Sequence, residues 1–173
     1  MEDPKSLRHM FTTELLGIFF LIFAGGGTIT TDRYNDNVVT VPGIAGLWGF
    51  TMSIFVSILG FTYGAHFCNL ITILHVIFKS PPLMQVPIHV VAQDVGSIFA
   101  TDILKLIFSE NKNRFVGIVP AGSNLQIFVI EFIISFYTLF IILGVFIDRR
   151  KIRELVGQII GATLIFSALF VGY

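Results

Sequence analysis

Long apolar stretches separated by short polar segments dominate the chain. Five of them are about 20 residues long, enough to cross about 30 Å of hydrocarbon at 1.5 Å per residue in an α-helix. They cover residues 11–31, 43–62, 86–108, 127–147 and 155–172. The pattern therefore predicts an all-α membrane protein in which five transmembrane helices form one domain, residues 1–173.

The segment of residues 63–78, between the second and third stretches, has a different character. It opens with a glycine-bearing bend at Gly64 and continues into a short apolar run that Pro81 and Pro82 bring to an end. It is too polar for a span and too apolar for a loop. Non-helical backbone inside a bilayer is tolerated only where it lines a cavity or is buried in protein. We therefore predict a re-entrant loop with a half-helix, which is a candidate pore or binding site.

Composition supports the membrane interpretation. The chain is 54% hydrophobic and 13% charged, whereas about 25% of the residues of an ordinary soluble domain are charged. No basic patch argues for a nucleic-acid partner, and we expect none; the net charge of zero does not bear on that question. The single cysteine, Cys68, excludes an intrachain disulfide framework.

Lysine and arginine in the short connecting segments predict the orientation. Seven lie on the side of the amino terminus and four on the other side. The first set is Lys5, Arg8, Lys79, Arg149, Arg150, Lys151 and Arg153, and the second is Arg33, Lys105, Lys112 and Arg114. Because cytoplasmic loops carry the excess of these residues, we expect a multi-pass protein with a cytoplasmic amino terminus. Whether it lies in the plasma membrane or an endomembrane stays open.

Four carboxylates fall inside the predicted spans, and three of them, Glu14, Glu131 and Asp94, lie away from the Asp102–Lys105 pair near the outer end of the third span. Glu14 lies about one turn inside the first, where an ionisable group is costly and should face the protein interior with a partner. Glu131 is its counterpart, because residues 130–136 match residues 13–19 at the Glu and at the Phe five positions later. Such similarity is typical of inverted repeats, so both are predicted to be structural intramembrane carboxylates. Asp94, near the middle of the third span, is either functional or a protonated, tolerated group.

Trp48, the only tryptophan, lies in the second span. Two interpretations stay open for it. It is an interfacial anchor, as tryptophan commonly is in membrane proteins, or it is a bulky wall of a pore constriction.

An enzymatic function has little support. Cys68 and His66 are two positions apart, but no carboxylate near them in the sequence would orient a nucleophile and base pair. The four histidines are dispersed and share no metal-ligand spacing: His9, His66, His75 and His89. We therefore expect no catalytic residue, no metal and no cofactor.

Several short motifs resemble those of one family. Residues 14–17 resemble a first-span Glu-x-x-Gly, residues 63–67 resemble Ser-Gly-Ala-His-Phe, and Val90-Val91-Ala92-Gln93 resembles the family's third span. In the outer loop, Phe115-Val116-Gly117, Pro120-Ala121-Gly122-Ser123 and Gln126 resemble one branch in particular. On these residues the chain resembles the aquaporins, or major intrinsic proteins, and most of all their plant nodulin-like intrinsic branch.

The resemblance implies an aquaporin-like right-handed helical bundle. The family has six spans and two half-helices that meet at the bilayer centre, each beginning with Asn-Pro-Ala. Here Cys68, Asn69 and Leu70 occupy the first of these motifs, so a thiol, a weaker donor, replaces the first pore amide. The chain ends where the family enters its second re-entrant loop. The expected bundle is therefore incomplete, with five transmembrane helices and one re-entrant half-helix.

The resemblance also implies a function and partners. We expect a channel for passive transport of water or small uncharged, glycerol-like solutes across a lipid bilayer, assembled as a homo- or hetero-tetramer with other aquaporin subunits. The alternative is a non-conducting, truncated family member that associates with full-length subunits or is inactive. The residues expected to line the pore are Trp48, Gly64, Ala65, His66, Cys68, Asn69, Leu70 and Ala168.

Overall fold

The computed structural model describes residues 4–60, 66–79, 85–108, 122–147 and 153–171. Its helices are α1 (Pro4–Tyr34), α2 (Thr40–Phe55), the π-helix η1 (Val56–Gly60), α4 (Asn69–Lys79), α5 (Gln85–Ile107), α6 (Asn124–Ile147), the 3-10 helix η3 (Arg153–Leu155) and α7 (Val156–Val171). Within these ranges there is no strand, so the predicted all-α class is confirmed.

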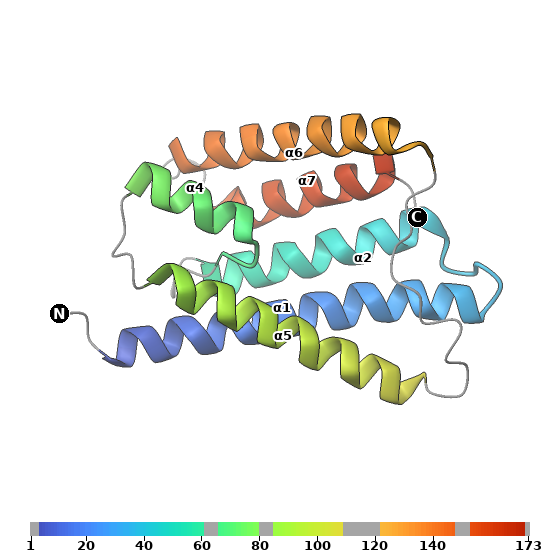
Figure 1. The fold of residues 1–173 in the computed structure, drawn as a ribbon, viewed down its shortest axis with the longest axis horizontal. Helices are drawn as coiled ribbons and strands as arrows, with labels where there is room; N and C mark the ends of the chain where they lie inside the picture. The colour runs from blue at the N-terminus through green and yellow to red at the C-terminus, as the bar shows by residue number, and fades with distance from the viewer. Residues whose placement is uncertain (1–3, 61–65, 80–84, 109–121, 148–152, 172–173) are drawn as a thin grey trace.

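The five long helices form a bundle in which consecutive helices alternate in direction (Figure 1). α1 packs chiefly against α5, and α2 packs chiefly against α7. α4 differs from the others, because it begins inside the bundle and runs out towards the end where α5 begins (Figure 1). Its 11 residues span about 16 Å, which is about half the thickness of the hydrocarbon core. α4 therefore has the length and direction of a half-helix.

Within the described ranges, three helices are long and apolar enough to cross a membrane: Leu7–Tyr34, Thr40–Leu59 and Asn124–Val145. α7 is apolar but has 16 residues. α5 has 23 residues and is long enough, but polar side chains such as Gln93 and Asp94 keep it out of this group. The apolar pattern thus describes α1, α2 and α6 better than it describes α5.

Several helices begin earlier than the apolar pattern predicts, and local residues explain the starts of α1 and α6. α1 starts at Pro4, so most of the polar segment before residue 11 is helical. Proline fits there because an N–H in the first turn has no partner within the helix. α6 starts at Asn124 because Ser123 and Gln126 cap it: Gln126 Oε1 accepts the Ser123 N–H at 2.9 Å, and the Gln126 N–H is 3.4 Å from Ser123 Oγ.

Glycines set the closest helix contacts. A Cβ on Gly49 of α2 would lie 2.5 Å from the carbonyl oxygen of Gly161 on α7, and the reverse distance is the same. A Cβ on Gly96 of α5 would lie 2.6 Å from the carbonyl oxygen of Leu15 on α1. Small residues at such crossings let membrane helices approach closely. Gly96, at the midpoint of α5, therefore lies level with the Leu15 turn of α1.

Candidate functional site

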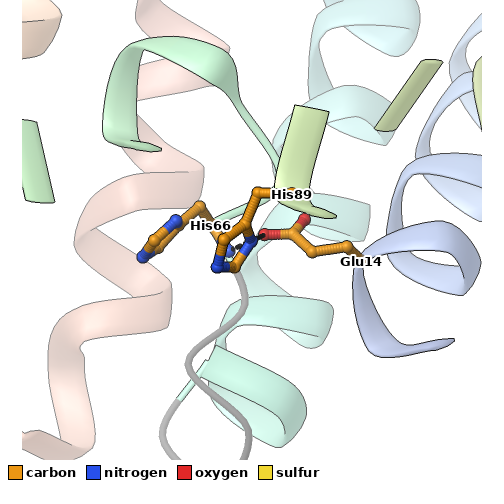
Figure 2. Close-up of side chains that lie close together, drawn as sticks. All are labelled: Glu14, His66 and His89. Atoms are coloured by element: carbon orange, nitrogen blue, oxygen red, sulfur yellow. Dashed lines mark hydrogen bonds and ion pairs between the residues drawn. The ribbon is translucent and has the colours of Figure 1, made fainter. Parts of the chain in front are cut away.

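Glu14 lies at the centre of the candidate site. Its side chain is completely buried on α1. Oε1 accepts the backbone N–H of His66 at 2.5 Å and lies 2.6 Å from Nδ1 of His89 on α5 (Figure 2). One carboxylate oxygen therefore joins α1, α5 and the segment that leads into α4.

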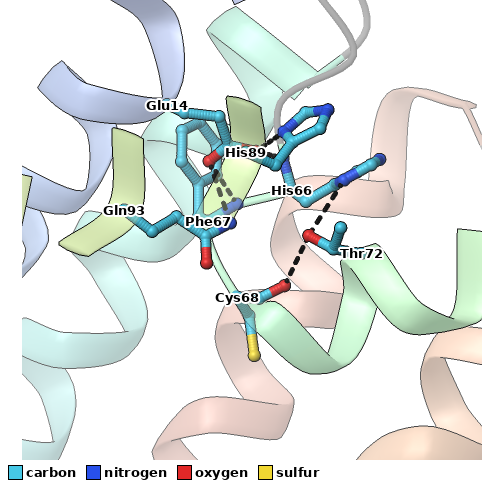
Figure 3. Close-up of polar contacts among 7 residues, drawn as sticks. All are labelled: Glu14, His66, Phe67, Cys68, Thr72, His89 and Gln93. Carbon is cyan, nitrogen blue, oxygen red and sulfur yellow. Dashed lines mark hydrogen bonds and ion pairs between the residues drawn. The ribbon is translucent and has the colours of Figure 1, made fainter. Parts of the chain in front are cut away.

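The second carboxylate oxygen of Glu14 likewise binds one backbone N–H and one side chain of α5. Oε2 of Glu14 accepts the backbone N–H of Phe67 at 2.9 Å and the Nε2–H of Gln93 at 3.4 Å (Figure 3). His89 and Gln93 lie one turn apart on α5 and are both buried. Hydrogen bonds to a charged group are each worth about 1.5–3 kcal/mol. Four donors on one buried carboxylate therefore make this cluster a strong link between segments.

The imidazole of His66 is buried and lies against His89 and Thr72. Its ring stacks on the ring of His89, with centroids 4.2 Å apart, and its Nδ1 lies 3.2 Å from Oγ1 of Thr72. Thr72 in turn donates its hydroxyl to the carbonyl of Cys68 at 3.2 Å (Figure 3). The side chain of His66 is thus tied to the first turn of α4.

The turn before α4 needs this support because its backbone is strained. Phe67 has a φ of 54°, and the left-handed region costs a non-glycine residue about 1–2 kcal/mol. Its ring is buried, and a Cβ on Gly17 would overlap it. Cys68 follows at the N-cap position, where its carbonyl accepts the N–H of Thr72 at 3.1 Å. Glu14 and Gly17, one turn apart on α1, therefore shape the start of the half-helix.

The N-terminal end of α4 provides a favourable electrostatic environment for the Glu14 carboxylate. The N-terminal end of a helix carries a partial positive charge, and a carboxylate near it is stabilised. Glu14 accepts N–H groups from the two residues just before the N-cap of α4. The positive end of α4 therefore lies inside the bundle, next to a buried negative charge.

Glu14, His66 and His89 also offer a set of metal-ligating atoms within 4.8 Å of one another. No pattern in the sequence predicts this set, because its members come from three separate segments. The carboxylate already accepts four hydrogen bonds, and the positive end of α4 opposes a cation there. The arrangement fits a structural anchor better than a metal centre.

Comparison with known proteins settles the family. The model of a family described as "Major intrinsic protein" matches residues 1–173. This chain belongs to the major intrinsic protein family.

Relatives of this major intrinsic protein belong to the nodulin-like branch, as the sequence motifs predicted. The chain is 44% identical to "Aquaporin NIP1-2" of Arabidopsis thaliana, covering 92% of this chain and 56% of that protein. It is 42% identical to "Nodulin-26" of Glycine max, covering 92% and 59%, and 40% identical to "Aquaporin NIP1-1" of Oryza sativa subsp. japonica, covering 92% and 56%. It thus spans little more than half the length of these relatives.

Two of the residues expected to line a major intrinsic protein pore contact the packed interior of the bundle. Trp48 and Cys68 pack against the same apolar cluster of α1, α2, α4, α6 and α7. Trp48 lies over Gly25 of α1, where a Cβ would overlap its ring, and its buried Nε1 has no hydrogen-bond partner in the part of the chain described. The ring of Trp48 on α2 therefore packs against α1.

The other expected pore residues are more scattered. Asn69 is exposed at the first position of α4, and Ala168 is buried in α7. Leu70 lies in the first turn of α4. Gly64 and Ala65 lie outside the described residues.

Two further carboxylates inside the predicted spans differ from Glu14. Glu131 on α6 and Asp94 on α5 are both exposed. Neither side chain has a hydrogen bond or ion pair among the described residues. Sequence symmetry thus paired Glu131 with Glu14, but the surroundings of the two side chains are different.

Sequence reasoning missed two partners of Glu14. In the sequence His89 is one of four dispersed histidines, and Gln93 is part of a motif. Their spacing of four residues places both on one face of a helix, and that face meets α1. This spacing is the signal in the sequence that could have identified them.

Proposed function

We propose that this protein acts as a passive channel for water or small uncharged, glycerol-like solutes. The observation that carries the proposal is the turn held by Glu14, which starts α4 inside the bundle of membrane helices. Such an irregular segment at membrane depth is tolerated where it is buried in protein or lines a pathway. The names of the relatives, aquaporin and nodulin, support a channel rather than an enzyme.

The geometry suggests how a solute would be selected. The N-terminal end of α4 would oppose cations and protons by its partial positive charge. Asn69, exposed at that end, would offer an amide to a passing solute, and Cys68 would offer a thiol. Because a thiol is a weak donor, we expect slower permeation than through a pore with an amide at that position.

The membrane topology and assembly are part of the same proposal. The bias of seven lysines and arginines against four supports a cytoplasmic amino terminus in a plasma membrane or endomembrane. Assembly into homo- or hetero-tetramers is proposed from family membership. Non-conducting association with full-length subunits is not favoured, because the relatives' names are those of channel proteins.

Osmotic swelling and labelled-glycerol uptake in oocytes expressing residues 1–173 test the proposal. Surface labelling establishes how much protein reaches the membrane. We expect swelling or uptake above that of uninjected cells, abolished by Cys68→Trp. Phe132→Trp is the matched control, because it adds the same indole to the exposed face of α6. Surface expression without swelling or uptake would contradict the proposal.

A further inference from the structure

The indole of Trp48 lies with one face on the backbone of α1 at Gly25. A Cβ at position 25 would overlap Cε2 and Cζ2 of the ring and lie 2.5 Å from Cδ2. Cε2 and Cδ2 are the atoms shared by the two rings of an indole, so an outside atom can approach both this closely only from a face of the ring. The absence of a side chain at Gly25 therefore lets the only tryptophan of the chain lie flat against a neighbouring helix.

Packing, and no hydrogen bond to a described residue, holds the indole in this place. Its Nε1 is buried and has no acceptor in the part of the chain that the structure describes. The ring otherwise packs on the apolar cluster of α1, α2, α4, α6 and α7, and apolar contacts are non-directional. The position of the Trp48 ring is thus set by the shape of its neighbours, and Gly25 is the neighbour that leaves room for it.

A side chain at position 25 would move the ring. Carbon atoms in contact are about 3.5–4.0 Å apart, so a Cβ there requires the indole to retreat from α1 by about 1 Å or more. Trp48 is carried by α2 and is only half-buried, so the part of its side chain away from Gly25 stays accessible. The retreat would narrow a path that runs past this accessible side.

The displacement matters most for the larger of two solutes that pass Trp48. A water molecule has a radius of about 1.4 Å, and a glycerol-like solute with three carbon atoms is wider, so a narrower path excludes the glycerol-like solute first. We propose that Gly25 is a positioning residue that sets solute specificity: it keeps the indole of Trp48 against α1 and so lets glycerol-like solutes pass as well as water. This role rests on the channel function proposed above.

Fluorescence of the full chain in detergent tests the contact without any measurement of flux. Because Trp48 is the only tryptophan, the emission spectrum and its quenching by acrylamide report the surroundings of this one indole. Gly25→Ala should change both relative to the parent chain. Gly26→Ala is the matched control, because a Cβ there meets the end of the Leu104 side chain at 3.1 Å, and it should leave both unchanged. Identical spectra and quenching in the parent and in Gly25→Ala would overturn the proposal.

Osmotic swelling and labelled-glycerol uptake in oocytes test the selectivity, each corrected for the amount of protein at the surface. In Gly25→Ala the ratio of glycerol uptake to swelling should fall several-fold, whereas Gly26→Ala should keep the ratio of the parent. In a Trp48→Ala background there is no indole to displace. Adding Gly25→Ala to that background should therefore leave its ratio unchanged.

The outcomes separate the role of Gly25 from the channel function. Equal losses of uptake and swelling in Gly25→Ala, or the same fall in ratio with and without the indole, would overturn the role of Gly25. If Gly25→Ala alone does not reach the surface, Trp48→Ala should restore its surface level, and a failure to restore it would also overturn that role. A parent chain that carries neither water nor glycerol would instead contradict the proposed channel function.

Discussion

His89 on α5 and Glu14 on α1 meet at 2.6 Å between Nδ1 and Oε1, completely enclosed by protein. The same carboxylate accepts the two backbone N–H groups that precede the cap of α4. The contact between two long helices and the start of the half-helix therefore depend on one side chain. Substitutions of Glu14 should therefore weaken both the α1–α5 contact and the start of α4.

Replacing Glu14 by glutamine should destabilise the fold strongly. The glutamine amide would turn an N–H₂ group towards donors that now bind a carboxylate oxygen. We expect a loss of about 3 kcal/mol, or a fall in melting temperature of about 6–12 °C, measured by circular dichroism in detergent. Glu131→Gln, which alters an exposed carboxylate, is the control and should change stability by less than about 0.5 kcal/mol. Equal effects of the two substitutions would count against the anchor.

His89 should act through Glu14. His89→Phe removes the Nδ1 donor but keeps an aromatic ring that can stack on His66, so we expect a loss of about 2 kcal/mol. In the Glu14→Gln background the same change should cost less, with a coupling energy of about 1–3 kcal/mol. A double-mutant cycle by thermal unfolding measures this coupling. Additive effects would mean that the two side chains do not act together.

The close approach of α1 and α5 predicts different outcomes for two glycines. Gly96→Ala would bring a methyl group 2.6 Å from a backbone carbonyl oxygen, so the helices must separate, at a cost of about 1–3 kcal/mol. Gly144→Ala meets nothing within 4 Å and should be neutral or stabilising by up to about 1 kcal/mol, as alanine is in helices. Thermal unfolding of the two variants side by side checks the contrast. Similar melting temperatures for Gly96→Ala and Gly144→Ala would show that α1 and α5 are farther apart at Gly96 than the structure indicates.

Cys68→Asn should strengthen the start of α4. Asparagine is a preferred N-cap residue, and such caps are worth about 1 kcal/mol over alanine. We expect Cys68→Asn to melt higher than the parent, and Cys68→Ala to show no such gain. In vesicles containing equal amounts of protein, Cys68→Asn should also raise water flux, measured by light scattering after an osmotic jump. A lower melting temperature for Cys68→Asn would mean that position 68 does not cap α4.

The sequence predicted the helices better than it predicted the contacts between them. The all-α class followed from apolar stretches of membrane-spanning length, and the family followed from short motifs such as that of residues 63–67. Burial of Glu14 with a partner was also expected, because a charge inside a span is costly. These inferences rest on chain length, composition and local order, which are properties of consecutive residues.

The tertiary structure alone decided which groups surround that carboxylate. His66 is 52 residues from Glu14, His89 is 75 and Gln93 is 79, and no local pattern links residues so far apart. The same is true of Trp48 packed on Gly25, and of Asp94 left facing outward. Periodicity specifies which residues share a face of one helix. Which faces meet depends on how glycines, rings and buried donors fit together across the bundle.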